Sequence, residues 1–453
     1  MTAHATWTWQ FPVERERLWR YLADTDWVNE HAGLPKIAAR YEPLETGGTR
    51  RIAWFRKGPV LFEWEERPTV WERPSYFAVE RLYRHGPLSR FATSTALEAL
   101  DDGSTRVVVE CALDAASPLT QPLLPLIMAQ GKRGANRAFR LAAALAAQPD
   151  GVPVSAELGP LTPLLRERVE PAVAGAIATF VASAENRDLQ RMRPYELADR
   201  WNLPRRDVLR AFLTATRLGL FNLSWSVICP GCRGPQPGME SLAQLHRGYH
   251  CEACNLQFDA AFDRSVEVTF DARPLGRATE QGLFCIASPV RSSHVYAQAV
   301  VAAEGGTHVF EADLERGSYD INVVGASVAP FSAVEEDAPS ELEAGVYPLT
   351  GIESGHEIRA GRVRIHVTNE LDREVVVRIE DGRWPDTYVT AAQVTALQDF
   401  RDLFSSQVLA PGLEMGIETM AILFTDLIGS TAMYSRTGDA PAFRIVTDHF
   451  DVV

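Results

Sequence analysis

Four of the six cysteines form two Cys-x-x-Cys pairs, Cys229 with Cys232 and Cys251 with Cys254. Residues 233–250 separate the pairs, and this spacing lets two knuckles place four thiolates around one tetrahedral ion. Zinc prefers this ligand set. Because four thiolates leave no open coordination position, the sequence predicts a structural zinc site rather than a catalytic one. A redox disulfide within a pair is the competing interpretation.

The remaining candidate metal ligands lie near these pairs or stand alone in the sequence. His246 and His250 could replace a thiolate, but with four cysteines present we expect them to be surface residues. Cys111 and Cys285 have no neighbouring cysteine or histidine motif, so we expect small core side chains. The zinc prediction therefore depends on the four paired cysteines alone.

A second group of residues with chemical potential lies near the end of the sequence. Residues 420–431 form an apolar run that ends in an acidic turn. Phe424 lies in the run, Asp426 follows it, and Gly429-Ser430-Thr431 comes next. Residues 438–450 then supply a Gly-Asp turn and a helical pattern. An aspartate at the end of a buried strand is a natural ligand for a hard divalent cation.

Residues 418–453 resemble the first strand, metal loop and first helix of class III adenylate and guanylate cyclases. The resemblance implies that Asp426 and the carbonyl of Leu427 bind magnesium or manganese. The nucleotide-binding residues it implies are Ile428, Gly429, Ser430 and Thr431. Their amides would contact the terminal phosphates of ATP or GTP, and the metal would activate the 3′-hydroxyl that attacks the α-phosphate. The product would be cyclic AMP or cyclic GMP.

The sequence departs from that family because the second metal carboxylate, the base-selecting residues and the transition-state residues all lie later in family members. This chain ends at Val453. We therefore expect no complete catalytic set here and no cyclic nucleotide production by this polypeptide alone. The resemblance also implies a homodimer, since family members place their sites at a dimer interface.

Residues 1–147 are predicted to form an α+β domain. The pattern places strands at about 6–11, 50–55, 60–65, 76–84, 89–100 and 105–114, a helix at 14–22 and a long final helix over 119–147. The apolar stripe expected on the long helix is Leu123, Ile127, Gly134, Ala138, Leu141 and Leu145. This order resembles the START-like helix-grip fold of the polyketide cyclase superfamily.

Such folds often hold an apolar ligand between sheet and helix. The candidate cavity residues are Trp54, Phe62, Trp64, Phe77 and Tyr83. The alternative is that these aromatic side chains only fill the core, and the sequence leaves both roles open.

A linker and a helix follow over 148–192, and residues 193–225 resemble a winged helix-turn-helix. Pro204 suits the start of its second helix, and Gly219 suits the end. Arg206, Arg210 and Arg217 share one face of that helix and could contact DNA phosphates. We favour the alternative, a solvated face on a packing module, so a nucleic-acid partner is not expected.

The remaining segments complete a multidomain prediction. Residues 226–264 resemble a zinc ribbon. Residues 265–388 show evenly spaced strands typical of a β-sandwich, at about 265–270, 282–287, 295–301, 308–314, 317–324, 345–349, 357–360, 362–369 and 374–380. Residues 389–417 contain a capping-box helix that could couple the upstream domains to the last segment, or simply connect them. Residues 418–453 would open a ferredoxin-like cyclase domain.

Composition excludes several functional classes. The 45 basic and 59 acidic side chains give a net charge of −14, which argues against nonspecific binding to nucleic acid or anionic lipid. The first residues lack a signal-peptide pattern, and no run approaches the roughly 20 apolar residues of a membrane span. We therefore expect a cytoplasmic protein without a membrane partner.

Three hypotheses about function follow from these segments. The first is the regulatory region of a nucleotidyl cyclase in signal transduction. The second is a START-like module that binds an apolar small molecule, either by itself or as the sensor of that cyclase. The third is a DNA-binding regulator that uses the winged-helix-like segment and the ribbon.

Overall fold

The chain divides into two compact units, residues 1–415 and 416–453, and each is described by itself. The computed structural model describes residues 2–44, 49–147, 161–184, 188–252, 254–262, 264–272, 289–290, 292–324, 327–335, 337–348, 350–407 and 427–452.

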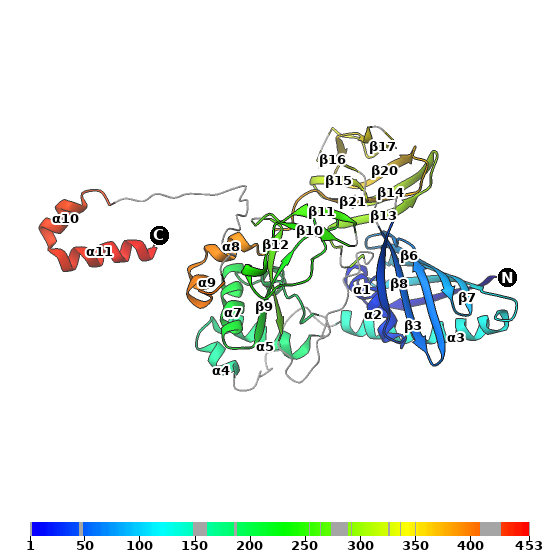
Figure 1. The fold of residues 1–453 in the computed structure, drawn as a ribbon, viewed down its shortest axis with the longest axis horizontal. Coiled ribbons are helices and arrows are strands. Elements are labelled where there is room, and N and C mark those ends of the chain that lie inside the picture. Colours follow the sequence, from blue (N-terminus) through cyan, green and yellow to red (C-terminus); the bar gives the residue numbers. More distant parts are fainter. Residues whose placement is uncertain are drawn as a thin grey trace. The chain divides into compact units, whose positions relative to one another are not determined.

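The first module is an antiparallel sheet with a long helix along one side (Figure 1). Its elements are β1 (Thr2–Phe11), α1 (Arg15–Leu22), α2 (Thr25–His31), β2 (Ala38–Pro43), β3 (Thr49–Lys57), β4 (Val60–Glu66), β5 (Val70–Glu72), β6 (Tyr76–His85), β7 (Leu88–Ala99), β8 (Thr105–Ala115), a 3-10 turn η1 (Gln121–Leu123) and α3 (Leu124–Ala146). The strands follow the order β2-β3-β4-β6-β7-β8-β1, and β5 pairs with the other end of β6. This arrangement agrees with the helix-grip prediction.

Alternation along the strands separates a helix-facing side of this sheet from an outer side. On β1, Trp7 and Phe11 are buried whereas the intervening Thr8 and Gln10 are exposed. Trp9 points to α3, because its ring lies 5.0 Å from that of Phe139. We call the space between the helix-facing side and the three helices the grip interior.

The buried stripe of α3 differs from the prediction. Its buried residues are Leu124, Ala138, Phe139, Ala142, Ala143 and Ala146, whereas Leu123 and Leu141 are exposed. The alanine-rich face brings the helix close to its neighbours: a Cβ at Gly134 would lie only 3.0 Å from Ala32 at the end of α2. Small residues therefore form the contact, and the leucines fall at its rim.

The second module contains helices and a long hairpin that carries the ribbon. Its elements are α4 (Leu161–Arg166), α5 (Pro171–Ser183), α6 (Pro194–Trp201), α7 (Arg205–Arg217), β9 (Phe221–Val227), η2 (Leu242–Gln244), β10 (Gly248–Cys251), β11 (Leu256–Asp259) and β12 (Val266–Ala272). β12 pairs with β9 from Val266 opposite Val227 to Ala272 opposite Phe221. The assignment of β12 to the sandwich is therefore corrected, and the ribbon occupies the tip of the β9–β12 hairpin.

The turn residues of this module match their predicted roles. Asn202 ends α6 in the left-handed region with φ 53°, and Gly219 follows α7 with φ 84°. Pro204 lies at the N-cap of α7. The helix-turn-helix geometry therefore follows from residues that tolerate or impose these backbone angles.

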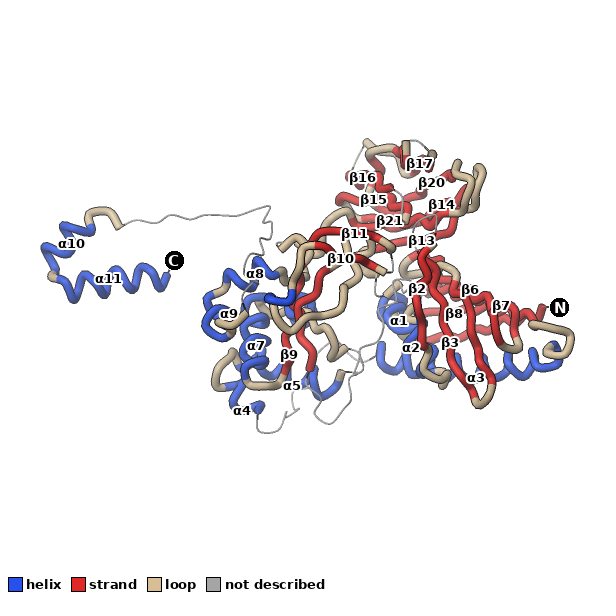
Figure 2. Tube along the Cα trace, in the orientation of Figure 1, coloured by secondary structure: helices blue, strands red, loops and turns tan. Residues whose placement is uncertain are grey.

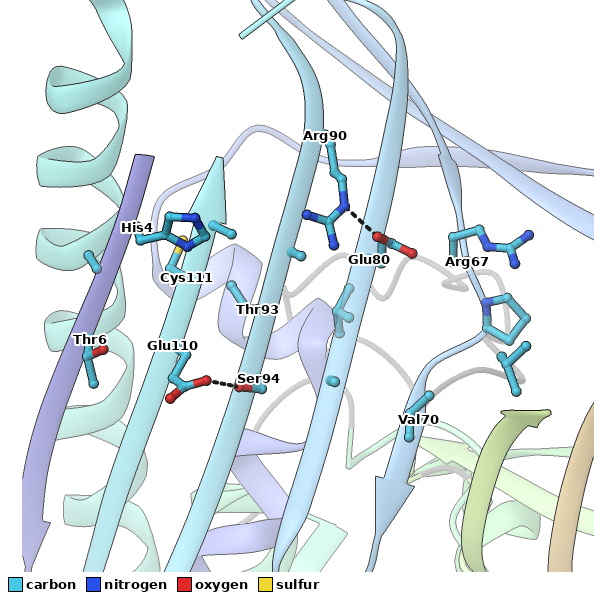
Figure 3. Close-up of a pocket in the computed structure, with 17 residues that line it drawn as sticks. His4, Thr6, Arg67, Val70, Glu80, Arg90, Thr93, Ser94, Glu110 and Cys111 are labelled. Carbon is cyan, nitrogen blue, oxygen red and sulfur yellow. Dashed lines mark hydrogen bonds and ion pairs between the residues drawn. The ribbon is translucent and has the colours of Figure 1, made fainter. Parts of the chain in front are cut away.

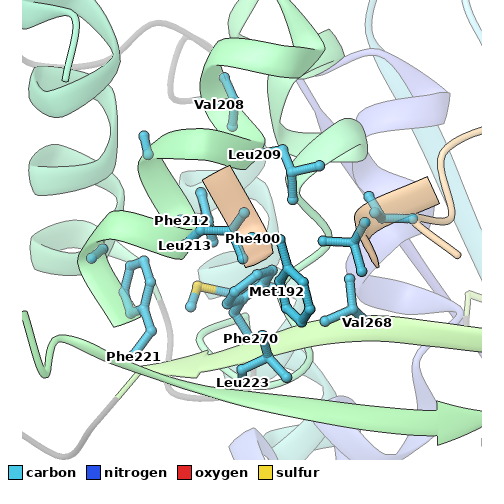
Figure 4. Packing of buried hydrophobic residues seen from close by; sticks show 14 of the residues in the cluster. Met192, Val208, Leu209, Phe212, Leu213, Phe221, Leu223, Val268, Phe270 and Phe400 are labelled. Atoms are coloured by element: carbon cyan, nitrogen blue, oxygen red, sulfur yellow. The ribbon is translucent and has the colours of Figure 1, made fainter. Parts of the chain in front are cut away.

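The predicted coupling helix belongs to the core of this module (Figure 4). It is two short helices, α8 (Ala391–Ala396) and α9 (Gln398–Leu403), because Leu397 is extended with ψ 132°. The capping box at Thr390 is present as predicted. The break lets Phe400 pack edge-on against Trp225, at 6.0 Å between rings.

The third part of this unit has two sheets around one apolar core (Figure 2). Its strands are β13 (Val295–Val301), β14 (Gly306–Leu314), β15 (Gly317–Val323), β16 (Ser327–Val334), β17 (Glu341–Tyr347), β18 (Gly351–Ser354), β19 (Glu357–Arg359), β20 (Gly361–Asn369) and β21 (Val375–Asp381). One layer runs β13-β21-β15-β16-β19 and the other β14-β20-β17-β18. The predicted strand at 282–287 lies outside the described residues.

β13 also joins this sandwich to the first module, because it pairs with β5 as well as with β21. Gln298 donates to the carbonyl of Thr69 at 2.6 Å, and its other amide atom accepts from Arg378 at 2.6 Å. Trp71 is fully buried and its indole faces the carbonyl of Val295 at 3.5 Å.

The sandwich buries a polar cluster around His294. Its Nε2 lies 3.9 Å from a carboxylate oxygen of Glu380. Burial, together with the positive charges of Arg233 and Arg378, lowers the pKa of His294 to about 2. Burial also raises the pKa of Glu380. His294 is therefore held neutral in the folded state.

The second unit contains α10 (Ser430–Thr437) and α11 (Asp439–Val452), joined by Gly438 with φ 79°. The helix predicted after the Gly-Asp turn is present. The preceding strand and Asp426 lie outside the described residues.

We predict that the free energy of unfolding decreases below a pH of about 6.5, by up to about 1.4 kcal/mol per pH unit. The reason is that only the unfolded chain protonates His294 in this range. Glu380 acts in the opposite direction, since its pKa is raised on folding. Urea unfolding at pH 7.5 and 5.5 should therefore show a smaller loss in His294→Gln than in the parent protein. The matched change His250→Gln alters an exposed histidine and should leave the parent's loss intact. Equal losses in the parent and His294→Gln would contradict this prediction.

Candidate functional site

The four paired cysteines form one cluster, as the sequence predicts. All four are buried, and their sulfur atoms lie within 4.8 Å of one another. The Sγ atoms of Cys232 and Cys251 are 3.7 Å apart. Four sulfurs about 2.3 Å from a tetrahedral zinc would be about 3.8 Å apart. The cluster therefore fits a metal ion such as zinc.

The backbone around the knuckles supports the same conclusion. Arg233 and Asn255 each follow the second cysteine of a pair, and both have φ 52°. The amide of Gly234 donates to Cys232 Sγ at 3.4 Å, as expected for a turn whose amides point at sulfur.

The histidines near the ribbon are not part of the cluster. His250 pairs with Asn255 at 3.1 Å on the surface, and His246 stacks on Tyr249 at 4.0 Å. Cys111 is buried in the first module, where burial raises its pKa to about 11. Cys285 lies outside the described residues.

The first knuckle also positions Arg233, a buried cation that sequence reasoning did not identify. Its guanidinium donates to the carbonyl of Asp381, the last residue of β21, and to the carbonyl of Arg383 at 2.8 Å. It also lies 5.7 Å from the ring of Trp384. The metal ligands are therefore one residue away from a side chain that fixes the end of the sandwich.

The predicted cavity residues separate according to strand register. Phe62, Trp64, Phe77 and Tyr83 lie on the helix-facing side of β4 and β6. Trp54 is the exception, because it pairs opposite Glu63 and therefore points to the outer side, where Arg40 covers its ring at 5.4 Å. Trp54 is removed from the predicted cavity.

The grip interior contains two apolar clusters rather than one. Trp64 packs with Ala53 and Phe55, whereas Phe77 packs with Trp19 and the core of α3. Tyr83 contacts both clusters. Burial raises the pKa of its phenol, although Arg81 opposes this.

Charged side chains lie between these clusters on the same side of the sheet. Glu66 pairs opposite Arg81 and forms ion pairs with both Arg81 and Arg51. The side chains of Glu66 and Arg81 are only 6% and 8% exposed. Sequence reasoning missed them, because a charged residue in an amphipathic strand is ordinarily assigned to the solvent side.

A separate depression of about 730 Å³ lies on the outer side of the same sheet (Figure 3). Its charged residues pair with one another: Arg90 donates to Glu80 at 2.6 Å. Ser94 likewise donates to Glu110 at 3.5 Å. None of the five predicted aromatic residues lines it. Because both of its arginines, Arg67 and Arg90, already pair with carboxylates, this depression is a weaker candidate than the grip interior.

The arginine face of α7 does not form a free basic stripe. Arg210 pairs with Asp399 of α9 at 2.9 Å, and α9 packs on this helix. Arg206 and Arg217 remain exposed. The chain's own carboxylate thus occupies part of the surface that a DNA reader would use.

The predicted nucleotide-binding residues lie at the start of α10. The carbonyl of Leu427 accepts from the amide of Ser430 at 3.2 Å, Ile428 is fully exposed, and Gly429 has φ 73°. Ser430 and Thr431 form the first turn of the helix. Because Asp426 lies outside the described residues, the magnesium site stays a prediction.

One known protein family matches part of this chain. Residues 156–281 match a family of unknown function, DUF5939. No curated protein matches the chain. Nothing in these comparisons supports the cyclase resemblance.

Several solved structures match part of the chain. The aromatase/cyclase Zhui from Streptomyces sp. R1128 is 13% identical, with a TM-score of 0.26, and the match covers 31% of this chain and 94% of that one. A protein from Thermus thermophilus is 15% identical, with a TM-score of 0.25, covering 32% and 100%. The di-domain aromatase/cyclase BexL of the BE-7585A biosynthetic pathway is 11% identical, with a TM-score of 0.26, covering 33% and 51%.

None of the described helices has the length and apolar character needed to cross a bilayer.

We predict that Cys232→Ser abolishes the binding of about one zinc per chain and lowers the thermal midpoint by roughly 5 °C or more, because metal binding energy contributes to folding. Elemental analysis and thermal unfolding measure these effects. Hydrogen exchange should also increase at residues 381–384, which Arg233 holds. Cys111→Ser removes another buried thiol and should leave the zinc content unchanged. Full zinc content in Cys232→Ser would contradict the assignment.

Proposed function

We propose that residues 1–147 form a START-like module that binds a small apolar molecule in the grip interior. The observation that supports this proposal is the division of that interior into two aromatic clusters with buried charges between them. A domain core usually forms one contiguous apolar cluster with smaller satellites, so the distinguishing feature here is the buried ion pair beside the Trp64 cluster. Polar groups placed among aromatic walls are typical of ligand-binding sites.

The other segments of the chain are consistent with a structural role, or with a role in transmitting ligand binding. The tetrathiolate cluster holds a structural metal, and the arginines of α7 are partly neutralised by α9. A cyclase role for residues 418–453 stays a prediction, and the binding module would then be its sensor. The test of ligand binding does not depend on that role.

We predict that 2-ethylnaphthalene, an apolar probe, raises the thermal midpoint of the full chain and changes its tryptophan fluorescence. Tyr83→Ala should weaken this binding about tenfold, because Tyr83 contacts both clusters.

Tyr76→Ala is the matched control, since Tyr76 lies on the same strand but its side chain is on the outer side of the sheet. It should leave binding unchanged. If the probe binds the parent protein and Tyr83→Ala equally tightly, it does not bind in the grip interior, and this result would contradict the proposal.

A further inference from the structure

Two buried N–H groups on adjacent strands have no hydrogen-bond acceptor among the described residues. They are the indole Nε1 of Trp64 on β4 and the guanidinium Nε of Arg81 on β6. Trp64 is completely buried, and Arg81 is 7% exposed. Both lie on the helix-facing side, because Trp64 pairs opposite Tyr83 and Arg81 opposite Glu66.

These two donors belong to one small region of the grip interior. The Arg81 guanidinium carbon lies 5.0 Å from the centre of the Trp64 ring and 5.4 Å from that of Phe91. The Arg81 Nε is 3.5 Å from a Glu66 oxygen, close enough for an ion pair but without a hydrogen bond from this nitrogen. Aromatic rings and two donors on neighbouring strands, unpaired among the described residues, thus lie together on the helix-facing side of the sheet.

Buried indoles among the described residues differ in this respect: those of Trp19, Trp64 and Trp384 lack an acceptor, whereas others have one. Trp225 donates to Gln407 at 3.1 Å, and Trp9 donates to Asn136 at 3.2 Å. Trp71 faces the Val295 carbonyl. Trp19 on α1, whose ring lies 5.8 Å from Phe77, resembles Trp64 in lacking an acceptor among the described residues. Two of the indoles without acceptors therefore belong to the grip interior.

The charges of the region determine which ligand group suits these donors. Arg51 and Arg81 share the single carboxylate of Glu66. Asp26 lies 4.0 Å from Arg51, so both arginines have carboxylate partners. Within the described part of this region, the groups without a partner are the N–H donors of Trp64 and Arg81, and donors favour a ligand oxygen over a ligand cation.

We propose that the ligand is an aromatic or similarly flat apolar molecule that carries a carbonyl or carboxylate oxygen, which accepts hydrogen bonds from Trp64 Nε1 and Arg81 Nε. The proposal rests on the proposed function and specifies its chemistry. The aromatic clusters bind the apolar body, and the two donors orient the oxygen. A purely hydrocarbon ligand would leave both donors without acceptors.

The test uses the full chain and three probes of similar size: 2-ethylnaphthalene, 2-acetylnaphthalene and 2-naphthoate. They share one ring system and carry no acceptor, a neutral acceptor and an anionic acceptor, respectively. We expect at least one oxygen-bearing probe to bind about tenfold more tightly than 2-ethylnaphthalene. The better of the two then identifies a carbonyl or a carboxylate ligand.

Trp64→Phe removes one donor and keeps an aromatic ring. It should abolish most of the preference for the oxygen-bearing probe. It should also lower the thermal midpoint of the free protein less than Trp225→Phe does, because both changes leave a cavity but only Trp225 loses a hydrogen bond. Trp225→Phe is the matched control, since its buried indole has an acceptor outside the grip. It should lower the thermal midpoint and keep the preference. Arg81→Met should also reduce the preference.

The outcomes separate the inference from the proposed function. Equal affinity for all three probes, or an unchanged preference in Trp64→Phe, overturns the inference and leaves the ligand site standing. Failure of all three probes to bind overturns both. A larger loss of thermal midpoint in free Trp64→Phe than in free Trp225→Phe would show that the Trp64 N–H stabilises the fold and would also count against the inference.

Discussion

A buried charged pair, Arg81 with Glu66, lies on the helix-facing side of the sheet, and the ligand chemistry that we propose depends on it. Removing such charges from water is costly unless their geometry and hydrogen bonds compensate. Here the compensation is incomplete, since Arg81 Nε and the neighbouring Trp64 Nε1 lack acceptors among the described residues. Apolar residues would fill the same positions with less desolvation. The pair is therefore better explained by binding than by stability.

The rest of the first unit holds this region through continuous contacts along the chain. The β5–β13 pairing joins the sheet of the first module to the sandwich. The turn that follows Cys229 and Cys232 places Arg233 against the end of β21. The segment after the sandwich returns to the helical module through Val394 and Phe400. Gln407 then accepts from both Trp225 and the amide of Leu242.

Local patterns predicted most of the strands and the metal cluster. Cys229 and its three partners follow from spacing alone, and β13 begins and ends where the alternation predicts. The sequence could not show that β12 pairs with β9, because a strand's partner depends on long-range contacts. It also could not show that Trp54 and Trp64 lie on opposite sides of the sheet, since a shift of one residue in the strand register moves a side chain to the other side. The buried donors require that register to be known, and so they appeared only in the structure.

The most direct test of oxygen recognition in the grip is the indole region of a ¹H–¹⁵N correlation spectrum. The Trp64 signal can be assigned by its loss in Trp64→Phe. On addition of whichever oxygen-bearing naphthalene binds more tightly, we predict a downfield shift of the Trp64 Nε1 proton, as expected for a new hydrogen bond, and a much smaller shift with 2-ethylnaphthalene. An unmoved Trp64 signal at saturating oxygen-bearing probe, or equal shifts with both probes, would contradict recognition of a ligand oxygen by this indole.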